Sequence, residues 1–222
     1  MTETKEIYQN ICYKIFKELE KDGFKYLKSG PTIKKISDDL TFQITFSSSH
    51  ANIKGHYVAL WAFGQVISKK YKDWARSRKY SSSNSKGIII TANSGNLTYP
   101  THWLEWNLAD KNDNKIAYEI ATVIKKSAYP IFKIFENKQS IINALTNQSF
   151  PILSPEKMIE YVYYLDGKET AKNLFDKYLV DFKVDNLQMQ KHITEYQLNG
   201  IPKVYPMLHS KQFAYIKLAL EL

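Results

Sequence analysis

The chain has 222 residues, of which 44% are hydrophobic, and its formal net charge is +9. This length suffices for one well-buried domain, or for one domain with a smaller helical part, and the many Phe, Tyr, Ile and Leu residues exclude a disordered chain. No stretch of 18 consecutive apolar residues predicts a membrane span. The first residues lack the pattern of a signal peptide, and a single cysteine, Cys12, excludes an intrachain disulfide. We therefore expect a cytoplasmic protein that does not bind a membrane.

The first part of the chain predicts a helix followed by a meander of strands. Over residues 4–21, apolar residues recur at four-residue intervals, and Gly23 suits the left-handed end of that helix. The segments FKYLKSG, PTIKKIS and LTFQITF then have the pattern of short strands, and the last alternates strictly between apolar and polar residues. HYVALWAFGQVIS predicts a longer, central strand. We expect an antiparallel meander that packs against the first helix.

The middle of the chain returns to helices. Ser68 is a candidate N-cap for a helix over 69–80, which a Ser-rich loop follows. KGIIIT predicts a buried strand and HWLEWNLAD a last strand. From residue 112 the helical period dominates, although Pro130 should kink or break the helix there.

The last third of the chain predicts helices only. FPILSPEK, at 150–157, has the composition of a linker, and helical hairpins should occupy residues 155–199 before a terminal helix. The predicted fold class is α+β: an antiparallel meander sheet packed against helices, followed by an α-helical C-terminal part. We expect an α+β domain over residues 1–150 and a helical subdomain over 151–222.

The positive charge is concentrated in one part of the chain. Residues 1–150 carry 22 basic and 13 acidic side chains, whereas residues 151–222 carry nine of each. The stretch KKYKDWARSRKYSSSNSK at 69–86 alone has seven cations and one acid. On a helix, residues 69, 72, 76 and 79 would form one cationic stripe, which favours an anionic partner. The alternative interpretation is a solvated helix end, because cations near a helix C-terminus are stabilised by the dipole.

Catalytic signatures are not found in the sequence. It has no G-x-S-x-G, Walker, G-x-G-x-x-G, C-x-x-C or H-E-x-x-H motif. Glu156 and Glu160 share a helical face in the first turns, where the dipole favours anions, but nothing singles them out as an acid/base pair. We predict no catalytic residue, no metal site and no cofactor, and we do not expect this chain to be an enzyme.

Two binding functions fit these patterns. The first is a protein-binding module with a basic face for an acidic partner, and the alternative is a nucleic-acid-binding protein that uses the helix at 69–80. Large aromatic side chains make good interface anchors and can also stack on bases. The predicted partner-binding residues are Lys69, Lys70, Lys72, Trp74, Arg76, Arg78, Lys79, Trp103 and Trp106.

Several segments together resemble a known bacterial family. They are the first helix with its DGF turn, the LTFQITF and HYVALW strands, the helix with Lys72 and Trp74, Trp106, and the run IATVIKKSAYPIFKIFENKQSIINAL. Over residues 5–148 this combination resembles the uncharacterised family called domain of unknown function 4304. The resemblance implies an α+β fold, and some members lie near polymorphic toxin systems, which implies an immunity or defence role. The basic loop at 69–86 and the tail at 155–222 fall outside it.

Overall fold

The computed structural model describes residues 3–27, 29–80, 86–109, 113–203 and 205–222. The chain forms two compact units, each of which has its own core. Unit 1 contains residues 1–67 and 90–137, and unit 2 contains residues 68–89 and 138–222. The last boundary between the units therefore lies at residue 137, whereas the sequence analysis placed it at residue 150. The segment 68–89 is part of unit 2.

An antiparallel sheet is the framework of unit 1, as predicted. Its strands follow the order β1-β2-β3-β4-β5, and β6 pairs with β4. In β3 the side chains of Phe42, Ile44 and Phe46 are buried while their neighbours are half-buried, as the alternating pattern indicates. The strands are β1 (Lys25–Leu27), β2 (Thr32–Ser37), β3 (Leu40–Ser47), β4 (Ala59–Ser68), β5 (Ile88–Asn93) and β6 (Trp106–Asn107).

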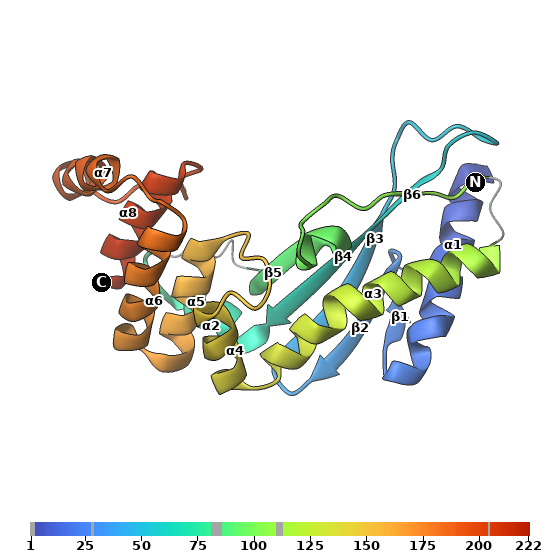
Figure 1. The fold of residues 1–222 in the computed structure, drawn as a ribbon, viewed down its shortest axis with the longest axis horizontal. Coiled ribbons are helices and arrows are strands. Elements are labelled where there is room, and N and C mark those ends of the chain that lie inside the picture. Colours follow the sequence, from blue (N-terminus) through green and yellow to red (C-terminus); the bar gives the residue numbers. More distant parts are fainter. Residues whose placement is uncertain (1–2, 28, 81–85, 110–112, 204) are drawn as a thin grey trace. The chain divides into compact units, whose positions relative to one another are not determined.

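Two long helices cover one face of this sheet (Figure 1). They are α1 (Glu3–Leu19) and α3 (Asp113–Phe135), which pack against each other. After α1, the short 3-10 helix η1 (Glu20–Asp22) ends at Gly23, whose φ of 88° confirms the predicted left-handed turn. The short 3-10 helix η2 (Ser94–Leu97) follows β5.

The sequence predicted a kink or a break at Pro130, and helix α3 runs through that residue without a break. Proline removes one backbone donor, which leaves the carbonyl of Lys126 without its helical partner. Both Pro130 and Lys126 are on the exposed side of the helix, where water can satisfy that carbonyl, while buried Ala128 and Ile131 hold the helix against the core.

Unit 2 is helical, which confirms the predicted C-terminal part. Gly167, with a φ of 85°, joins α5 to α6, and the Tyr178 hydroxyl donates to the carbonyl of Leu145 at 3.0 Å to connect α6 with α4. Within the described part of the chain, no helix is long and apolar enough to cross a membrane. The helices are α2 (Lys69–Ser77), α4 (Lys138–Thr146), α5 (Pro155–Asp166), α6 (Lys168–Asp181), α7 (Asn186–Asn199) and α8 (His209–Leu220).

Candidate functional site

The start of helix α2 is fixed by two residues that precede and follow it in the chain. The Ser68 hydroxyl accepts a hydrogen bond from the amide of Tyr71 at 2.9 Å, which confirms the predicted N-cap. The amide of Ser68 donates to the carbonyl of Gly87 at 2.9 Å. Gly87 has a φ of +72°, and a Cβ at this position would lie 2.3 Å from the backbone oxygen of Ser68. Only glycine therefore fits at this position.

Aromatic contacts attach the inner face of α2 to α5. Tyr71 is only 1% exposed, and its ring lies 5.1 Å from Tyr161 and 5.5 Å from Tyr164, centroid to centroid. The half-buried Trp74 ring lies 5.4 Å from Tyr164 and 6.2 Å from Tyr163. Trp74 was predicted as a partner-binding residue, but most of its surface is used in this packing.

Arg78 has a structural role within unit 2. Its guanidinium lies over the rings of Trp74, at 5.0 Å, and Tyr163, at 5.3 Å, and Nη2 donates to the carbonyl of Ala219 at 2.7 Å. The helix ends at Ser77 and Arg78 is extended, so α2 is shorter than the predicted helix over 69–80. Lys79 therefore lies beyond the helix and its charge does not continue the predicted helical stripe.

The remaining predicted cations lie on α2 and just beyond its C-terminal end. Lys69, Lys70, Arg76 and Lys79 are exposed, and Lys72 is half-buried. Lys69, Lys72 and Arg76 form no ion pair with another described residue, and the Lys79 ammonium lies 5.1 Å from the Tyr80 ring. We call this set the α2 basic surface: Lys69, Lys70, Lys72, Arg76 and Lys79.

The other two predicted anchors, Trp103 and Trp106, belong to unit 1. Trp103 is 55% exposed, and its ring meets those of Trp61 at 6.2 Å and Phe63 at 5.8 Å edge to face. Trp106 is half-buried in β6, where it pairs with Leu60. The predicted partner-binding residues are thus divided between the two units.

Glu105 holds the segment between these tryptophans. Its carboxylate accepts from Trp61 Nε1 at 2.5 Å and from the hydroxyl of Tyr57. The hydrogen bonds from Tyr57 and Trp61 lower the pKa of the Glu105 carboxyl below its usual value. The amide of Leu104 donates to Asn93 Oδ1 at 2.9 Å, which also fixes this segment.

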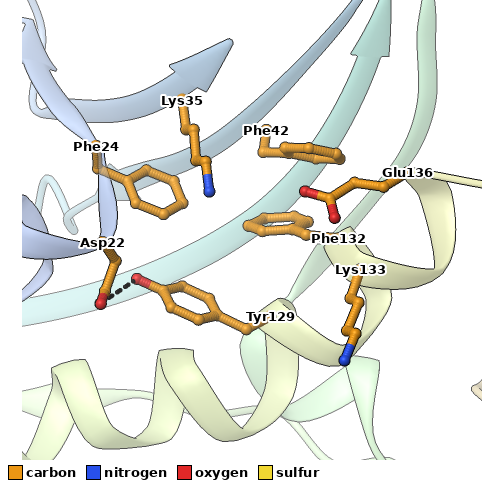
Figure 2. Close-up of a pocket in the computed structure, with 8 residues that line it drawn as sticks. All are labelled: Asp22, Phe24, Lys35, Phe42, Tyr129, Phe132, Lys133 and Glu136. Carbon is orange, nitrogen blue, oxygen red and sulfur yellow. Dashed lines mark hydrogen bonds between the residues drawn. The ribbon is translucent and has the colours of Figure 1, made fainter. Parts of the chain in front are cut away.

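Unit 1 contains an aromatic pocket that the sequence did not reveal (Figure 2). Its volume is about 380 Å³, and its walls come from η1, the residues after it, β2, β3 and the end of α3. Phe42 and Phe132 stack with their centroids 5.0 Å apart, and Phe24 and Tyr129 stack at 5.5 Å. The pocket is lined by Asp22, Phe24, Lys35, Phe42, Tyr129, Phe132, Lys133 and Glu136.

The negative charge of Asp22, on one side of this pocket, is balanced by a lysine. The Lys125 ammonium is 2.9 Å from its Oδ2, and the Tyr129 hydroxyl donates to the same oxygen at 3.0 Å (Figure 2). Burial on its own would raise the pKa of Asp22, but Lys125 and Tyr129 outweigh it and lower the pKa. Burial, assisted by the Asp22 charge, raises the pKa of Tyr129, so this hydroxyl stays a donor.

Unit 2 buries the two carboxylates that the sequence analysis placed on one face of a helix in its first turns. Glu156 is 3% exposed and Glu160, one turn later on α5, is 0% exposed. Burial raises the pKa of Glu156, against the opposing effects of its own amide, Lys157, Tyr205 and His209. Glu156 Oε2 has no hydrogen bond of normal geometry with a described residue. The only local signal was the apolar character of the surrounding residues, among them Met158 and Ile159.

Comparisons with known proteins add no relative. No family model matches the chain, and no curated protein or solved structure matches it either. Among the described residues, no group of three or more His, Cys, Asp or Glu side chains could hold a metal ion. The similarity of residues 5–148 to domain of unknown function 4304 therefore stays a hypothesis.

Proposed function

We propose that this protein is a cytoplasmic protein-binding module that captures an acidic partner protein through the α2 basic surface. The supporting observation is that Tyr71 and Trp74 anchor α2 to α5, while Lys69, Lys70 and Arg76 of the same helix are exposed. A cationic surface on a fixed support steers an acidic protein toward it and costs little ordering on binding. The net charge of +9 adds to that attraction.

The alternative function is nucleic-acid binding at the same surface. The packing of the aromatic side chains near this surface argues against the binding of a single strand by base stacking. Base stacking needs ring faces that are open to solvent. Tyr71 is buried, Trp74 lies between tyrosines and Arg78, and Tyr80 packs edge to face on Tyr215 at 6.4 Å. What remains for a nucleic acid is a phosphate contact by lysines and Arg76.

The biological setting of this module is a second proposal. A role in a bacterial toxin-immunity or antiviral defence system follows only from the resemblance of residues 5–148 to domain of unknown function 4304. An inhibitor of that kind would use charge to reach its partner quickly, because electrostatic complementarity mainly raises the association rate.

Neutralising the α2 basic surface should abolish capture of the partner without unfolding the protein. The variant is Lys69→Gln, Lys72→Gln, Arg76→Gln and Lys79→Gln. Lys69, Arg76 and Lys79 are exposed, and exposed substitutions usually change stability by within about 0.5 kcal/mol each. In a pull-down from the source cell, the parent should retain an acidic protein after nuclease treatment and the variant should lose it. With the purified partner, the association rate should fall more than the dissociation rate rises.

The matched control removes four exposed lysines elsewhere in unit 2. Lys168, Lys183, Lys191 and Lys203 are exposed, and their change to Gln removes the same charge. The control should keep the partner, which separates a local surface from a general charge effect. Equal capture by all three proteins would contradict the proposal. Capture lost on nuclease treatment, with a salt slope that shrinks by about three to four in the variant, would establish the nucleic-acid alternative instead.

A further inference from the structure

The sheet of unit 1 has a second face, opposite the one that α1 and α3 cover (Figure 1). Phe42 of β3 faces α3, because it stacks on Phe132. Gly64 of β4 also faces α3, because a Cβ at this position would lie 3.3 Å from that of Ala128. The residues that alternate with them point to the other face, where their side chains are half-buried or exposed. We call this set the open sheet face: Lys25, Lys34, Gln43, Thr45, Trp61, Phe63, Gln65 and Thr91.

A line of polar side chains crosses the open sheet face from β1 to β5. Lys25 lies opposite Lys34, and Lys34 lies opposite Gln43, in the strand register. Gln43 Nε2 donates to Gln65 Oε1 at 2.7 Å, and Gln65 Nε2 donates to Thr91 Oγ1 at 3.1 Å. The register and these hydrogen bonds place all of these side chains on the same face of the sheet.

The two lysines at one end of this line form a site for an anion. Neither makes an ion pair with another residue that the structure describes. Like charges directly opposite each other destabilise a sheet, so the pairing of Lys25 with Lys34 costs stability in the free protein. A phosphate bound between them would remove this repulsion and accept charge-assisted hydrogen bonds.

An exposed aromatic ring lies beside the polar line. Trp61, Phe63 and Gln65 are alternate residues of β4, so they share the open sheet face. The Trp103 ring meets Trp61 at 6.2 Å and Phe63 at 5.8 Å, and Trp103 remains 55% exposed. From the usual spacings of a sheet, the Cα of Phe63 lies about 12 Å from that of Lys34, which a short single strand can span. Trp103 therefore offers a stacking surface within reach of the lysines.

Glu105 gives this surface a direction. Its carboxylate accepts hydrogen bonds from the Trp61 indole and the Tyr57 hydroxyl, which lower the pKa of Glu105 and keep it ionised. A phosphate is therefore repelled from the aromatic end and attracted to the lysine end. The ligand that complements this arrangement has a flat, uncharged ring at Trp103 and a phosphate at the two lysines.

We propose that the open sheet face binds single-stranded nucleic acid, with a base stacked on Trp103 and the adjacent phosphates on Lys25 and Lys34. A single strand fits better than a duplex, because its bases are free to lie on an aromatic ring. The polar line between the two ends suits sugars and phosphates, whereas the centre of a protein interface is apolar. This site is separate from the α2 basic surface and does not depend on the proposed function.

The test is fluorescence anisotropy of a labelled oligothymidylate of about twelve nucleotides, a length in the range of single-strand sites. Two probes of the same length are compared with it: a duplex, and an abasic oligonucleotide that keeps the phosphates and lacks the bases. The full chain should bind the single strand about tenfold more tightly than either, the effect of one stacked base. No binding at about 100 μM protein and low salt, or equal binding of the single strand and the abasic probe, would overturn the proposal.

Substitutions assign the two ends of the ligand. Trp103→Ala should weaken the oligothymidylate about tenfold and leave the abasic probe unchanged, whereas Trp103→Phe should keep most of the affinity because a ring remains. Lys25→Gln with Lys34→Gln should weaken both probes and lower the salt slope by about 1.4. The matched control is Lys126→Gln with Lys133→Gln, which removes two exposed lysines of α3. Equal weakening by the two lysine pairs would show a general charge effect and refute the site.

The quadruple variant of the α2 basic surface separates the two surfaces of this protein. It should keep the preference for the single strand over the abasic probe, although its lower net charge weakens both. A preference that disappears in this variant and survives Trp103→Ala would place the bases near α2 and contradict the proposal. Trp103→Phe and the Lys25/Lys34 variant retain the packing of unit 1, so they test the site even if Trp103→Ala lowers stability.

Discussion

Trp74→Ala should lower the free energy of unfolding of unit 2 by about 3–5 kcal/mol, the usual cost of truncating a packed tryptophan. The ring fills the space between α2 and α5, where it contacts Tyr71, Tyr163 and Tyr164, and it supports the Arg78 guanidinium at 5.0 Å. Its loss would leave a cavity and remove the cation–π contact at the same time. Chemical denaturation followed by far-ultraviolet circular dichroism measures this change without relying on tryptophan fluorescence.

Trp103→Ala is the matched control for this substitution. The Trp103 side chain is 55% exposed and meets only the edges of Trp61 and Phe63 among the rings of unit 1 that the structure describes. Its removal should cost on the order of 1 kcal/mol, the size of an aromatic pair contact. If the two variants lose the same stability, or if Trp74→Ala leaves the transition unchanged, then Trp74 is not the anchor of α2.

Glu156→Gln should stabilise the protein at neutral pH, because the Gln side chain carries no charge that burial would disfavour. Because burial raises the folded-state pKa of Glu156, folding favours its neutral form. In the parent, the stability that comes from burying the neutral carboxyl is therefore present at acidic pH, and it is lost as the pH rises through the folded-state pKa. Gln stays neutral at every pH, so the gain should grow from acidic toward neutral pH.

Unfolding curves collected across that pH range measure the gain. Glu169→Gln, on the exposed first turn of α6, is the control and should follow the parent at every pH. A Glu156→Gln protein with the same pH slope as the parent would show that folding does not shift the pKa of Glu156. A gain that is largest at acidic pH would reverse the sign of the argument and contradict the raised pKa.

Local patterns in the sequence predicted the elements well. The strict alternation around Phe42, Ile44 and Phe46 identified a half-buried strand because side chains in a strand alternate between its two faces. Ser68 and Gly23 identified the start and end of helices because caps depend on residues only a few positions apart. These predictions needed no knowledge of the distant chain.

Predictions that depended on distant contacts were weaker. Tyr71 packs on Tyr161 and Tyr164, about ninety positions away, and no local pattern shows that α2 joins the helical unit. The pocket was missed for the same reason, since its residues come from separate elements along residues 22–136. The position of Glu156 near a helix start suggested only an anion favoured by the helix dipole, but α8 packs against α5 and Glu156 is buried. Tertiary burial therefore overrode the helix-dipole argument.

The chain passes between the two units three times, near residues 67, 89 and 137. A protein truncated at residue 150 would keep α2 and lose α5, so the rings of Tyr71 and Trp74 would be exposed to water. Exposed aromatic surface of this kind promotes aggregation. A separable unit 1 instead requires removal of residues 68–89 with a short turn in their place, in addition to a stop after residue 137. Residues 68–89, which include α2 and the α2 basic surface, are thus an insertion within the sequence of unit 1 that folds as part of unit 2.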